Sequence, residues 1–441
     1  MKCAVIIPVG PGHEYLAEDS IDSAGSAFAA NSGPFSEVTV VRVDDTQGLL
    51  GRSAARNKGV AEAQAQGAEW LFFLDADDLM DPGAFGVMAD YHADHDAVWG
   101  LICELNQDEE TYTVRPGQLS SIQTLEQVLT TDPTLTLQMG HFVRTSVAAS
   151  IPFDTTLDCG EDFDYYLRLW ERFRCRKIAT PLFLNRRGLH STGPRSATGR
   201  QWSEAVRSVI KARCRAAQLV CELRCENETF RFRIIDPFDP VQWHLVRGTF
   251  YELAELLTVR DSLKQGAVIL EIGADIGVRA VFLSRFLRPV RMVLLEPDLA
   301  QLDALRANVS ANSVGSADTG IFGPGESDGR NRADAPLAPL AVGHPAGLAR
   351  APSAAARVQL PEAIVGEKAD LIVINAAGRE LELLEQLKST IAGSRPHLLV
   401  VLAGHDLESV DAWRRKHRYR AVGRFEYSGS LHLFLEAERG N

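Results

Sequence analysis

The stretch from Glu69 to Asp78, which reads EWLFFLDADD, constrains the fold of this chain more than any other segment. Five consecutive apolar residues predict a short strand that is buried on both faces of a parallel sheet. Asp75 and Asp77 follow it with one residue between them, so they leave the same side of an extended chain. Neighbouring carboxylates raise each other's pKa unless a cation lies between them. The pattern therefore indicates a hard divalent ion, Mg²⁺ or Mn²⁺, shared with a substrate's phosphates.

A second interpretation of this stretch needs no metal. The acidic residues could form a turn that starts the next helix, with Asp81-Pro82 as its start signal. The residues of the stretch alone leave both interpretations open.

The bulk properties limit the domain number and the function class. The 441 residues exceed a single hydrophobic core of about 250–300 residues, so we expect two domains. A net charge of −12 argues against broad nucleic-acid binding, although it leaves room for a small phosphate site. The seven cysteines lack zinc-type spacing, and no signal peptide or membrane-spanning run is expected. These features are typical of a cytoplasmic protein with reduced thiols.

The beginning of the chain predicts a parallel α/β sheet. Ala4 to Val9 forms a first strand, and Pro8 near its end suggests that the backbone leaves the sheet there. After a helical segment, Glu37 to Val43 forms a second strand that ends in Asp44 and Asp45. Ligands bind beyond the carboxyl ends of such strands, so this acidic pair faces a ligand on topology alone. A polar turn is the alternative.

The segment Gly51 to Gly59, which reads GRSAARNKG, places cations near the start of an Ala-rich helix. Its charged residues are Arg52, Arg56 and Lys58. A helix N-terminus beside Arg side chains is a suitable place for a diphosphate.

Four motifs of the first half carry a resemblance to a known family. They are IIPVG at the first strand, VDD at 43–45, GRSAARNKG at 51–59 and FLDADD at 73–78. Together they resemble a family-2 glycosyltransferase of the GT-A fold. The resemblance implies a nucleotide-sugar donor, usually a uridine diphosphate (UDP) sugar, and a divalent metal, Mn²⁺ or Mg²⁺.

The resemblance also implies roles for individual residues. Asp44 would lie near the nucleotide base, and Arg56 near the nucleotide or its phosphates. Asp75 and Asp77 would hold the ribose and the metal–diphosphate. We add Pro8, at the end of the first strand, to the expected donor contacts.

The pair Glu161-Asp162 continues the resemblance at a predicted helix start. In the family the Asp of such a pair is the catalytic base, here Asp162. One carboxylate takes the acceptor hydroxyl's proton while the metal stabilises the departing diphosphate, so a single displacement inverts the sugar carbon. Two acidic residues that only stabilise a helix N-terminus are the alternative.

His190 follows the Arg186-Arg187-Gly188 run, and it completes the predicted metal site. Some relatives bring a His at this place to the metal or the diphosphate, and a neutral imidazole is a suitable ligand. An ordinary loop His is the other interpretation.

The second half contains a different nucleotide-type element. Ala267 to Ile272 predicts a buried strand that runs into a turn with Gly273 and Gly277, and a second strand ends at Glu296. Glycines let a ligand approach the backbone closely. An acidic residue about 20 residues beyond such a turn can accept hydrogen bonds from ribose hydroxyls. A third glycine and a phosphate-binding cation are both missing, which favours a ligand with ribose but without pyrophosphate.

These residues resemble a class I S-adenosylmethionine methyltransferase of the FkbM type, over residues 226–441. The matching parts are YE at 251–252, EIGADIG, LLEPD at 295–298, the spaced pair Asn308 and Asn312, and DLIVINAAGRELELL at 370–384. The family implies O-methylation of a hydroxyl, commonly on a sugar or a related metabolite. The cofactor contacts that carry over are Gly273, Asp275, Gly277 and Glu296. A Rossmann-like scaffold without a ligand is the alternative.

One departure from the methyltransferase pattern puts the chemistry in question. The family usually ends the later strand in Asp-x-Glu-Gly, whereas this chain reads Asn375-Ala376-Ala377-Gly378. Both acids are replaced, which leaves no obvious base at that place.

The sequence thus predicts an α/β protein of two domains. Residues 1–220 form a GT-A, Rossmann-like nucleotide-sugar domain, and residues 226–441 form a class I methyltransferase domain with a mobile loop at 313–357. We expect a bifunctional enzyme that attaches a sugar and methylates a hydroxyl. The second interpretation is a glycosyltransferase with a non-catalytic methyltransferase-like domain. A nucleotidyltransferase is a third, but it leaves Glu161-Asp162 unexplained.

The expected partners follow from these assignments. They are a nucleotide sugar and a glycan, lipid-linked or small-molecule acceptor, without nucleic acid, and a homo-oligomer is compatible with the sequence.

Overall fold

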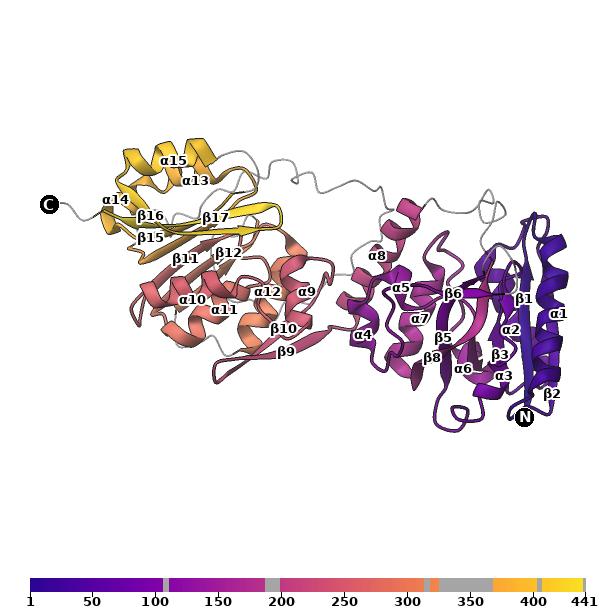
Figure 1. Cartoon of the computed structure of the whole chain (residues 1–441). Helices are drawn as coiled ribbons and strands as arrows, with labels where there is room; N and C mark the ends of the chain where they lie inside the picture. The colour runs from indigo at the N-terminus through magenta and orange to yellow at the C-terminus, as the bar shows by residue number, and fades with distance from the viewer. Residues whose placement is uncertain (106–110, 187–198, 313–317, 325–367, 403–406, 439–441) are drawn as a thin grey trace. The chain divides into compact units, whose positions relative to one another are not determined.

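The chain forms two compact units in this computed structural model, Met1–Ala217 and Gln218–Asn441 (Figure 1). The structure describes residues 1–105, 111–186, 199–312, 318–324, 368–402 and 407–438. Both units combine a central sheet with helices, so the predicted mixed α/β class is confirmed. Within these ranges, no helix is both long enough and apolar enough to cross a membrane.

The first unit is built on an eight-stranded sheet. Its order is β2-β1-β3-β7-β5-β8-β4, with β6 paired to β5. Strands β1, β2 and β3 are parallel, whereas β7 runs antiparallel to both β3 and β5. The strands are β1 (Lys2–Val9), β2 (Glu37–Asp44), β3 (Trp70–Phe73), β4 (Leu79–Met80), β5 (Ala97–Leu105), β6 (Tyr112–Val114), β7 (His141–Arg144) and β8 (Cys175–Asn185).

Helices cover this sheet, and α1 lies along β1 and β2 (Figure 1). Trp70 and Phe72 of the acidic stretch are fully buried, as expected for an interior strand. The helices are α1 (Glu14–Ala30), α2 (Arg52–Ala65), α3 (Ala84–Val87), α4 (Leu125–Thr130), α5 (Pro133–Thr136), α6 (Thr145–Ser150), α7 (Glu161–Arg172) and α8 (Gly199–Ala216).

Pro8 does not end the first strand, which corrects the expectation that the backbone leaves the sheet there. Strand β1 continues beside β2 to the pair Val9↔Asp44, whereas its pairing with β3 ends at Ile6↔Phe73. Ile6 accepts the Leu74 N–H on the β3 side, and Pro8, two residues on, faces the same side without an N–H to donate. The sheet therefore opens between β1 and β3, where the strand order reverses and ligands of α/β sheets bind.

The second unit contains a seven-stranded sheet in the order β13-β12-β11-β14-β15-β17-β16, and a separate hairpin of β9 and β10. The first five strands of that order are parallel, and β17 runs antiparallel to β15 and β16. The strands are β9 (Val220–Cys225), β10 (Glu228–Arg233), β11 (Val268–Ile272), β12 (Arg291–Leu295), β13 (Asp318–Phe322), β14 (Leu371–Asn375), β15 (His397–Leu402), β16 (Tyr419–Tyr427) and β17 (Ser430–Ala437).

Helices cover both faces of the second sheet, with α13 and α15 on one face and α10 and α11 on the other (Figure 1). Alternate residues of β14 supply the two cores, since Val373 belongs to one apolar cluster and Ile374 to the other. The helices are α9 (Pro240–Val246), α10 (Leu253–Ser262), α11 (Val278–Leu287), α12 (Leu299–Ala311), α13 (Glu380–Gln386), α14 (Lys388–Ser394) and α15 (Leu407–Lys416).

The predicted loop at 313–357 is wrong over one short part. Asp318–Phe322 form β13, which pairs with β12 from Arg291↔Asp318 to Leu295↔Phe322. Ile321 and Phe322 are buried. The strand lies at the edge of the sheet and, among the described strands, pairs only with β12, so these two buried apolar residues are enough to hold it there. Residues 313–317 and 325–357 of that loop lie outside the described residues.

Asn308 of α12 and Asn312, which follows the last residue of that helix, hold strand β10 in place. Asn308 accepts the Arg233 N–H through Oδ1 (2.6 Å) and donates through Nδ2 to the Ile276 carbonyl (2.8 Å). Asn312 accepts the Arg231 N–H (2.9 Å) and donates to the Arg231 carbonyl (2.6 Å). The two amides thus satisfy the edge of β10 as a neighbouring strand would.

We predict that Asn308→Ala destabilises the second unit. The substitution leaves the Arg233 N–H and the Ile276 carbonyl without their partner, at about 1–3 kcal/mol for each buried group. Ser310→Ala, at an exposed position on the same helix, should change the unfolding free energy by less than about 0.5 kcal/mol. Urea unfolding of the full chain measures both. Equal losses in the two variants would contradict the role of Asn308.

Candidate functional site

The acidic turn after β3 is fixed by side chains from two other elements. Ser20 of α1 places its Oγ 2.8 Å from the Ala76 carbonyl and 2.7 Å from the Asp78 carbonyl. Arg186, at the end of β8, donates through Nε to the Asp77 carbonyl (2.8 Å) and through its backbone N–H to Asp78 Oδ1 (3.2 Å). The turn is therefore held rigidly by α1 and β8 at the carboxyl edge of the sheet.

Three carboxylates meet in this turn. Oxygen atoms of Asp75, Asp77 and Asp78 all lie within 4.8 Å of one another. Burial, reinforced by repulsion from Asp77 and Asp75, raises the pKa of Asp78 well above its ordinary value. A divalent cation would relieve this repulsion, so the donor set fits a hard metal ion. Asp78 was not among the predicted ligands, although the sequence places it next to Asp77. His190, the third predicted ligand, lies outside the described residues.

Arg56 of α2 connects the acidic turn to the start of α7. Its Nη2 donates to Asp75 Oδ1 (2.9 Å), and its Nη1 donates to Glu161 Oε1 (3.2 Å). Both Arg56 and Glu161 are buried, so this ion pair is shielded from water. The sequence placed Arg56 near the nucleotide, and the structure places it between two groups of candidate residues.

Glu161 and Asp162 differ in their surroundings. Glu161 is paired with Arg56 and lies 3.7 Å from Arg52 Nε, so its charge is compensated. Asp162 is half-buried and accepts the Phe163 N–H (2.8 Å). Burial, with repulsion from Glu161, raises the pKa of Asp162 to about 7. A carboxylate with this pKa can accept a proton near neutral pH.

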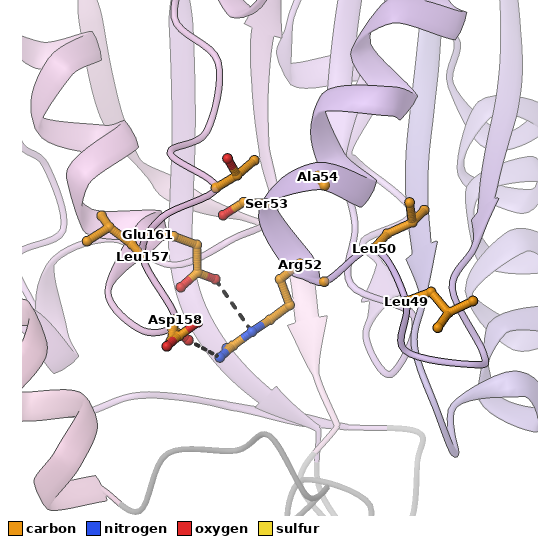
Figure 2. Close-up of a pocket in the computed structure, with 10 residues that line it drawn as sticks. Leu49, Leu50, Arg52, Ser53, Ala54, Leu157, Asp158 and Glu161 are labelled. Carbon is orange, nitrogen blue, oxygen red and sulfur yellow. Dashed lines mark hydrogen bonds and ion pairs between the residues drawn. The ribbon is translucent and has the colours of Figure 1, made fainter.

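A pocket of about 440 Å³ lies beside these residues. Two segments line it: residues 49–54, which lead into the first turn of α2, and residues between 155 and 161, which lead to the start of α7. Figure 2 shows Arg52 reaching between Glu161 and Asp158, where Nη2 donates to the Asp158 carbonyl (3.1 Å). Leu49 and Leu50 lie apart from this polar group in the same view, and both are exposed. The pocket thus combines a polar wall, which includes Glu161, with an apolar wall of Leu49 and Leu50.

The pair Asp44 and Asp45 serves two purposes. Asp45 is buried and accepts the N–H groups of Leu50 and Gly51 (2.8 Å each), so it closes the loop that leads into α2. Asp44 is exposed at the carboxyl edge, and a hydrogen bond from the Thr46 N–H lowers its pKa. The polar-turn interpretation applies to Asp45, whereas Asp44 keeps an accessible carboxylate near the half-buried Pro8.

In the second unit, Gly273 and Gly277 lie in the turn after β11. The strand order of the sheet reverses between β11 and β14. Both have positive φ angles, +76° and +85°. A Cβ on Gly273 would lie 2.0 Å from the Asn375 carbonyl oxygen, and one on Gly277 would lie 2.5 Å from Leu305 Cδ1. These glycines therefore let other elements of the same domain, rather than a ligand, approach the backbone closely.

Glu296 faces the same glycine turn from the end of β12. It is buried, and its carboxylate accepts the N–H groups of Asp275 (2.7 Å) and Asp298 (2.8 Å). Burial, with repulsion from Asp275, raises the pKa of Glu296 to about 8. Donation from ribose hydroxyls would favour its ionised form, so Glu296 fits a nucleoside ligand.

Asn375, which stands where the methyltransferase pattern has an acid, pairs with Asp275. Its Nδ2 donates to Asp275 Oδ2 (3.0 Å), a contact that a second carboxylate would turn into repulsion. The buried Glu380 accepts the N–H groups of Ala376 (3.3 Å) and Gly378 (2.9 Å) and so fixes the turn after β14. The four cofactor candidates Gly273, Asp275, Gly277 and Glu296 are thus brought together, without an acid at 375 or 377.

Comparisons with known proteins match part of the chain. Residues 35–150 match the model of the family described as "Glycosyl transferase family 2". No curated protein matches significantly. Among solved structures, TarS residues 1–349 of S. aureus in complex with UDP-GlcNAc has 18% identity and a TM-score of 0.36, over 50% of this chain and 68% of that one.

Two methyltransferase structures are each similar to less than half of the chain. Precorrin-6y C5,15-methyltransferase from Geobacter metallireducens GS-15 has 13% identity and a TM-score of 0.30, over 43% of this chain and 89% of that one. The B. subtilis tRNA methyltransferase TrmK has 19% identity and a TM-score of 0.29, over 42% and 65%.

We predict that Arg56→Met strongly destabilises the first unit. The change leaves Glu161 buried without its closest cation, which costs about 3–5 kcal/mol. Arg52→Met is the matched control: the Arg52 side chain is 43% exposed and lies 3.7 Å from Glu161, so water screens its attraction and its loss should cost less than about 1 kcal/mol. Urea unfolding decides between them. If the two variants had the same free energy of unfolding, the Arg56–Glu161 ion pair would not stabilise the first unit.

Proposed function

We propose that the first unit is a metal-dependent glycosyltransferase. It transfers a sugar from a nucleoside diphosphate sugar, with UDP as the nucleotide, to an acceptor hydroxyl with inversion. The observation that carries the proposal is the link from the Asp75–Asp77 turn through Arg56 to Glu161-Asp162. The match of residues 35–150 to Glycosyl transferase family 2 supports it.

The cluster of Asp75, Asp77 and Asp78 supports a bound Mn²⁺ or Mg²⁺, because their oxygens are close enough to share one ion. We propose Asp75 and Asp77 as its ligands, with His190 as a third. When bound, the cation would offset the charge that develops on the diphosphate leaving group. Arg56 of α2 compensates part of the negative charge of the acidic turn through its ion pair with Asp75.

Asp162 is the proposed base. Its pKa of about 7 lets it remove the proton of an acceptor hydroxyl at neutral pH. Glu161 is the proposed positioning residue, since its ion pair with Arg56 anchors the first turn of α7. Asp44 and Pro8, at the ends of β2 and β1, are the proposed contacts for the nucleotide.

The acceptor in this proposal is a hydroxyl of a glycan, a lipid-linked sugar or a small molecule. The pocket of Figure 2 supports it, since the pocket borders Glu161 and offers both polar and apolar walls.

We predict that Asp162→Asn lowers release of UDP from UDP-sugars by about 10²–10⁴-fold, the range expected when a base is lost. In the wild type the rate should fall about tenfold per unit below a pH of about 7, because the base must be deprotonated. A panel of UDP-glucose, UDP-galactose and UDP-N-acetylglucosamine with Mn²⁺ provides the donors, and water or an added hydroxyl the acceptor. Retained activity in Asp162→Asn would remove the base from the mechanism.

A control separates the base from the donor site. In calorimetry with UDP and Mn²⁺, Asp162→Asn should bind like the wild type, within about twofold, whereas Asp77→Ala should lose the Mn²⁺-dependent part of the affinity. Unchanged Mn²⁺ dependence in Asp77→Ala would argue against the metal role. Release of pyrophosphate instead of UDP would favour the nucleotidyltransferase alternative.

For the second unit we propose binding of S-adenosylmethionine and O-methylation of a glycan or related hydroxyl. The glycine turn supports the cofactor site, since the N–H of Asp275, between Gly273 and Gly277, donates to the buried Glu296. The replacement of both acids at 375 and 377 supports the alternative, a domain that binds a ligand or partner without transferring a methyl group.

We predict that the full chain binds S-adenosylmethionine with a dissociation constant in the micromolar range (on the order of −8 kcal/mol), and that Glu296→Ala abolishes this binding. Asp303→Ala is the control, since Asp303 is exposed on α12. Isothermal titration calorimetry measures all three proteins. Absence of binding in the folded wild type would favour the non-catalytic alternative.

A further inference from the structure

A chain of three hydrogen-bonded side chains joins β17 to α10 in the second unit. Ser430 Oγ lies 2.9 Å from His432 Nε2, and His432 Nδ1 lies 2.5 Å from Glu255 Oε2. Glu255 and His432 are buried, at 0% and 2% exposure, whereas Ser430 is half-buried. These hydrogen bonds thus connect a buried carboxylate to a half-buried serine.

The positions of the protons follow from the partners of Glu255. Burial opposes its ionisation, but hydrogen bonds from His432 and Arg279 outweigh burial and lower the pKa of Glu255. An ionised carboxylate only accepts hydrogen bonds, so His432 Nδ1 carries a proton. In the neutral imidazole, the lone pair of Nε2 then faces Ser430 and accepts its hydroxyl proton. A hydroxyl that donates to an imidazole oriented by a carboxylate has the arrangement of an activated nucleophile.

Ser430 lies at the ligand-binding edge of the sheet. Strand β17 runs antiparallel to β15, so its first residues lie beside the carboxyl end of β15, with Leu431 opposite Leu402. His432 is level with Val401, which is level with Asn375 at the end of β14. Open α/β sheets bind ligands at this edge.

The hairpin turn that precedes Ser430 keeps the serine accessible. Ser428 and Gly429 form this turn, and both are exposed. The Tyr251 hydroxyl accepts the Ser428 N–H (3.0 Å). This hydrogen bond anchors the β16–β17 hairpin.

The charged residues around Glu255 and His432 bear on the kind of substrate that Ser430 could meet. Glu252, Glu255 and Glu271 surround Arg279, which contacts all three, so carboxylates outnumber the guanidinium. This excess of negative charge disfavours an anionic substrate. An uncharged carbonyl compound, such as a carboxylic ester, is compatible with it.

We propose that Ser430 is a nucleophile toward an uncharged carboxylic ester, with His432 as its base and Glu255 as the positioning residue. The Ser430 Oγ–carbonyl carbon bond forms as the Oγ proton moves to His432 Nε2. The ester C–O bond then breaks, and His432 returns the proton to the leaving alcohol. Water hydrolyses the acyl-serine with the same base, which releases the acid and restores Ser430. The proposal is independent of both functions proposed above.

A purely structural role for the same contacts makes a different prediction. In that case His432 only ties β17 to α10, and Ser430 reacts no faster than any exposed serine. The two roles therefore differ in the reactivity of Ser430.

The test uses the full chain and a fluorophosphonate probe, which reports serine nucleophiles. The Ser430 Oγ–P bond forms, the P–F bond breaks, fluoride leaves and His432 takes the proton. We expect an adduct that peptide mass spectrometry maps to Ser430, absent in Ser430→Ala and retained in Ser428→Ala, the exposed serine of the same hairpin. His432→Gln should slow labelling at least tenfold (about 1.4 kcal/mol or more in the barrier). No adduct at Ser430, or an equal rate in a folded His432→Gln, would overturn the proposal.

A second variant decides the case if His432→Gln fails to fold. In Ser430→Cys, the neighbouring imidazole should shift the half-maximal rate of iodoacetamide alkylation below the free-thiol pH of about 8.5. Ser428→Cys should react with a midpoint near that of a free thiol. Equal midpoints in the two cysteine variants would also overturn the proposal.

Discussion

The first unit depends on one buried guanidinium. Arg56 is the partner of both Asp75 and Glu161, two carboxylates that lie 86 positions apart in the chain (161 − 75). Without a cation between them these charges would oppose the approach of α7 to the end of β3. The bridge also anchors Glu161, the first residue of α7, which Asp162 follows directly. A single side chain of α2 therefore links one candidate metal ligand, Asp75, to the helix start that carries the candidate base.

The two units place their candidate sites at equivalent positions of their sheets, but different residues shape those positions. Both place their candidate sites where the strand order reverses, β1 against β3 and β11 against β14. In the first unit, Pro8 lacks the N–H that would continue pairing with β3, and the sheet opens. In the second, Gly273 lets the Asn375 carbonyl approach, and Asn375 binds Asp275, so backbone and amide groups hold the edge together.

Much of this arrangement could be predicted from local patterns. The apolar run before Asp75 predicted a buried strand, and Trp70 to Phe73 form β3 with no exposure. The carboxyl-edge placement of Asp44 and Glu296 followed from strand–helix–strand order. The contact between His432 and Glu255 could not be predicted, because the two residues are distant in sequence and meet only through the antiparallel return of β17. The short strand β13 was missed because two buried apolar residues give too weak a pattern.

By itself, the sequence determined the mixed α/β class and which carboxylates and glycines end the strands. These features depend on hydrophobic periodicity and turn chemistry, which are local. Only the tertiary structure decided what each residue contacts. Asp45 closes a loop while Asp44 stays exposed. Glu161 forms an ion pair with Arg56, while the pKa of Asp162 rises to about 7. Burial and long-range pairing set such differences, and two adjacent acids look the same in a sequence until the fold assigns their neighbours.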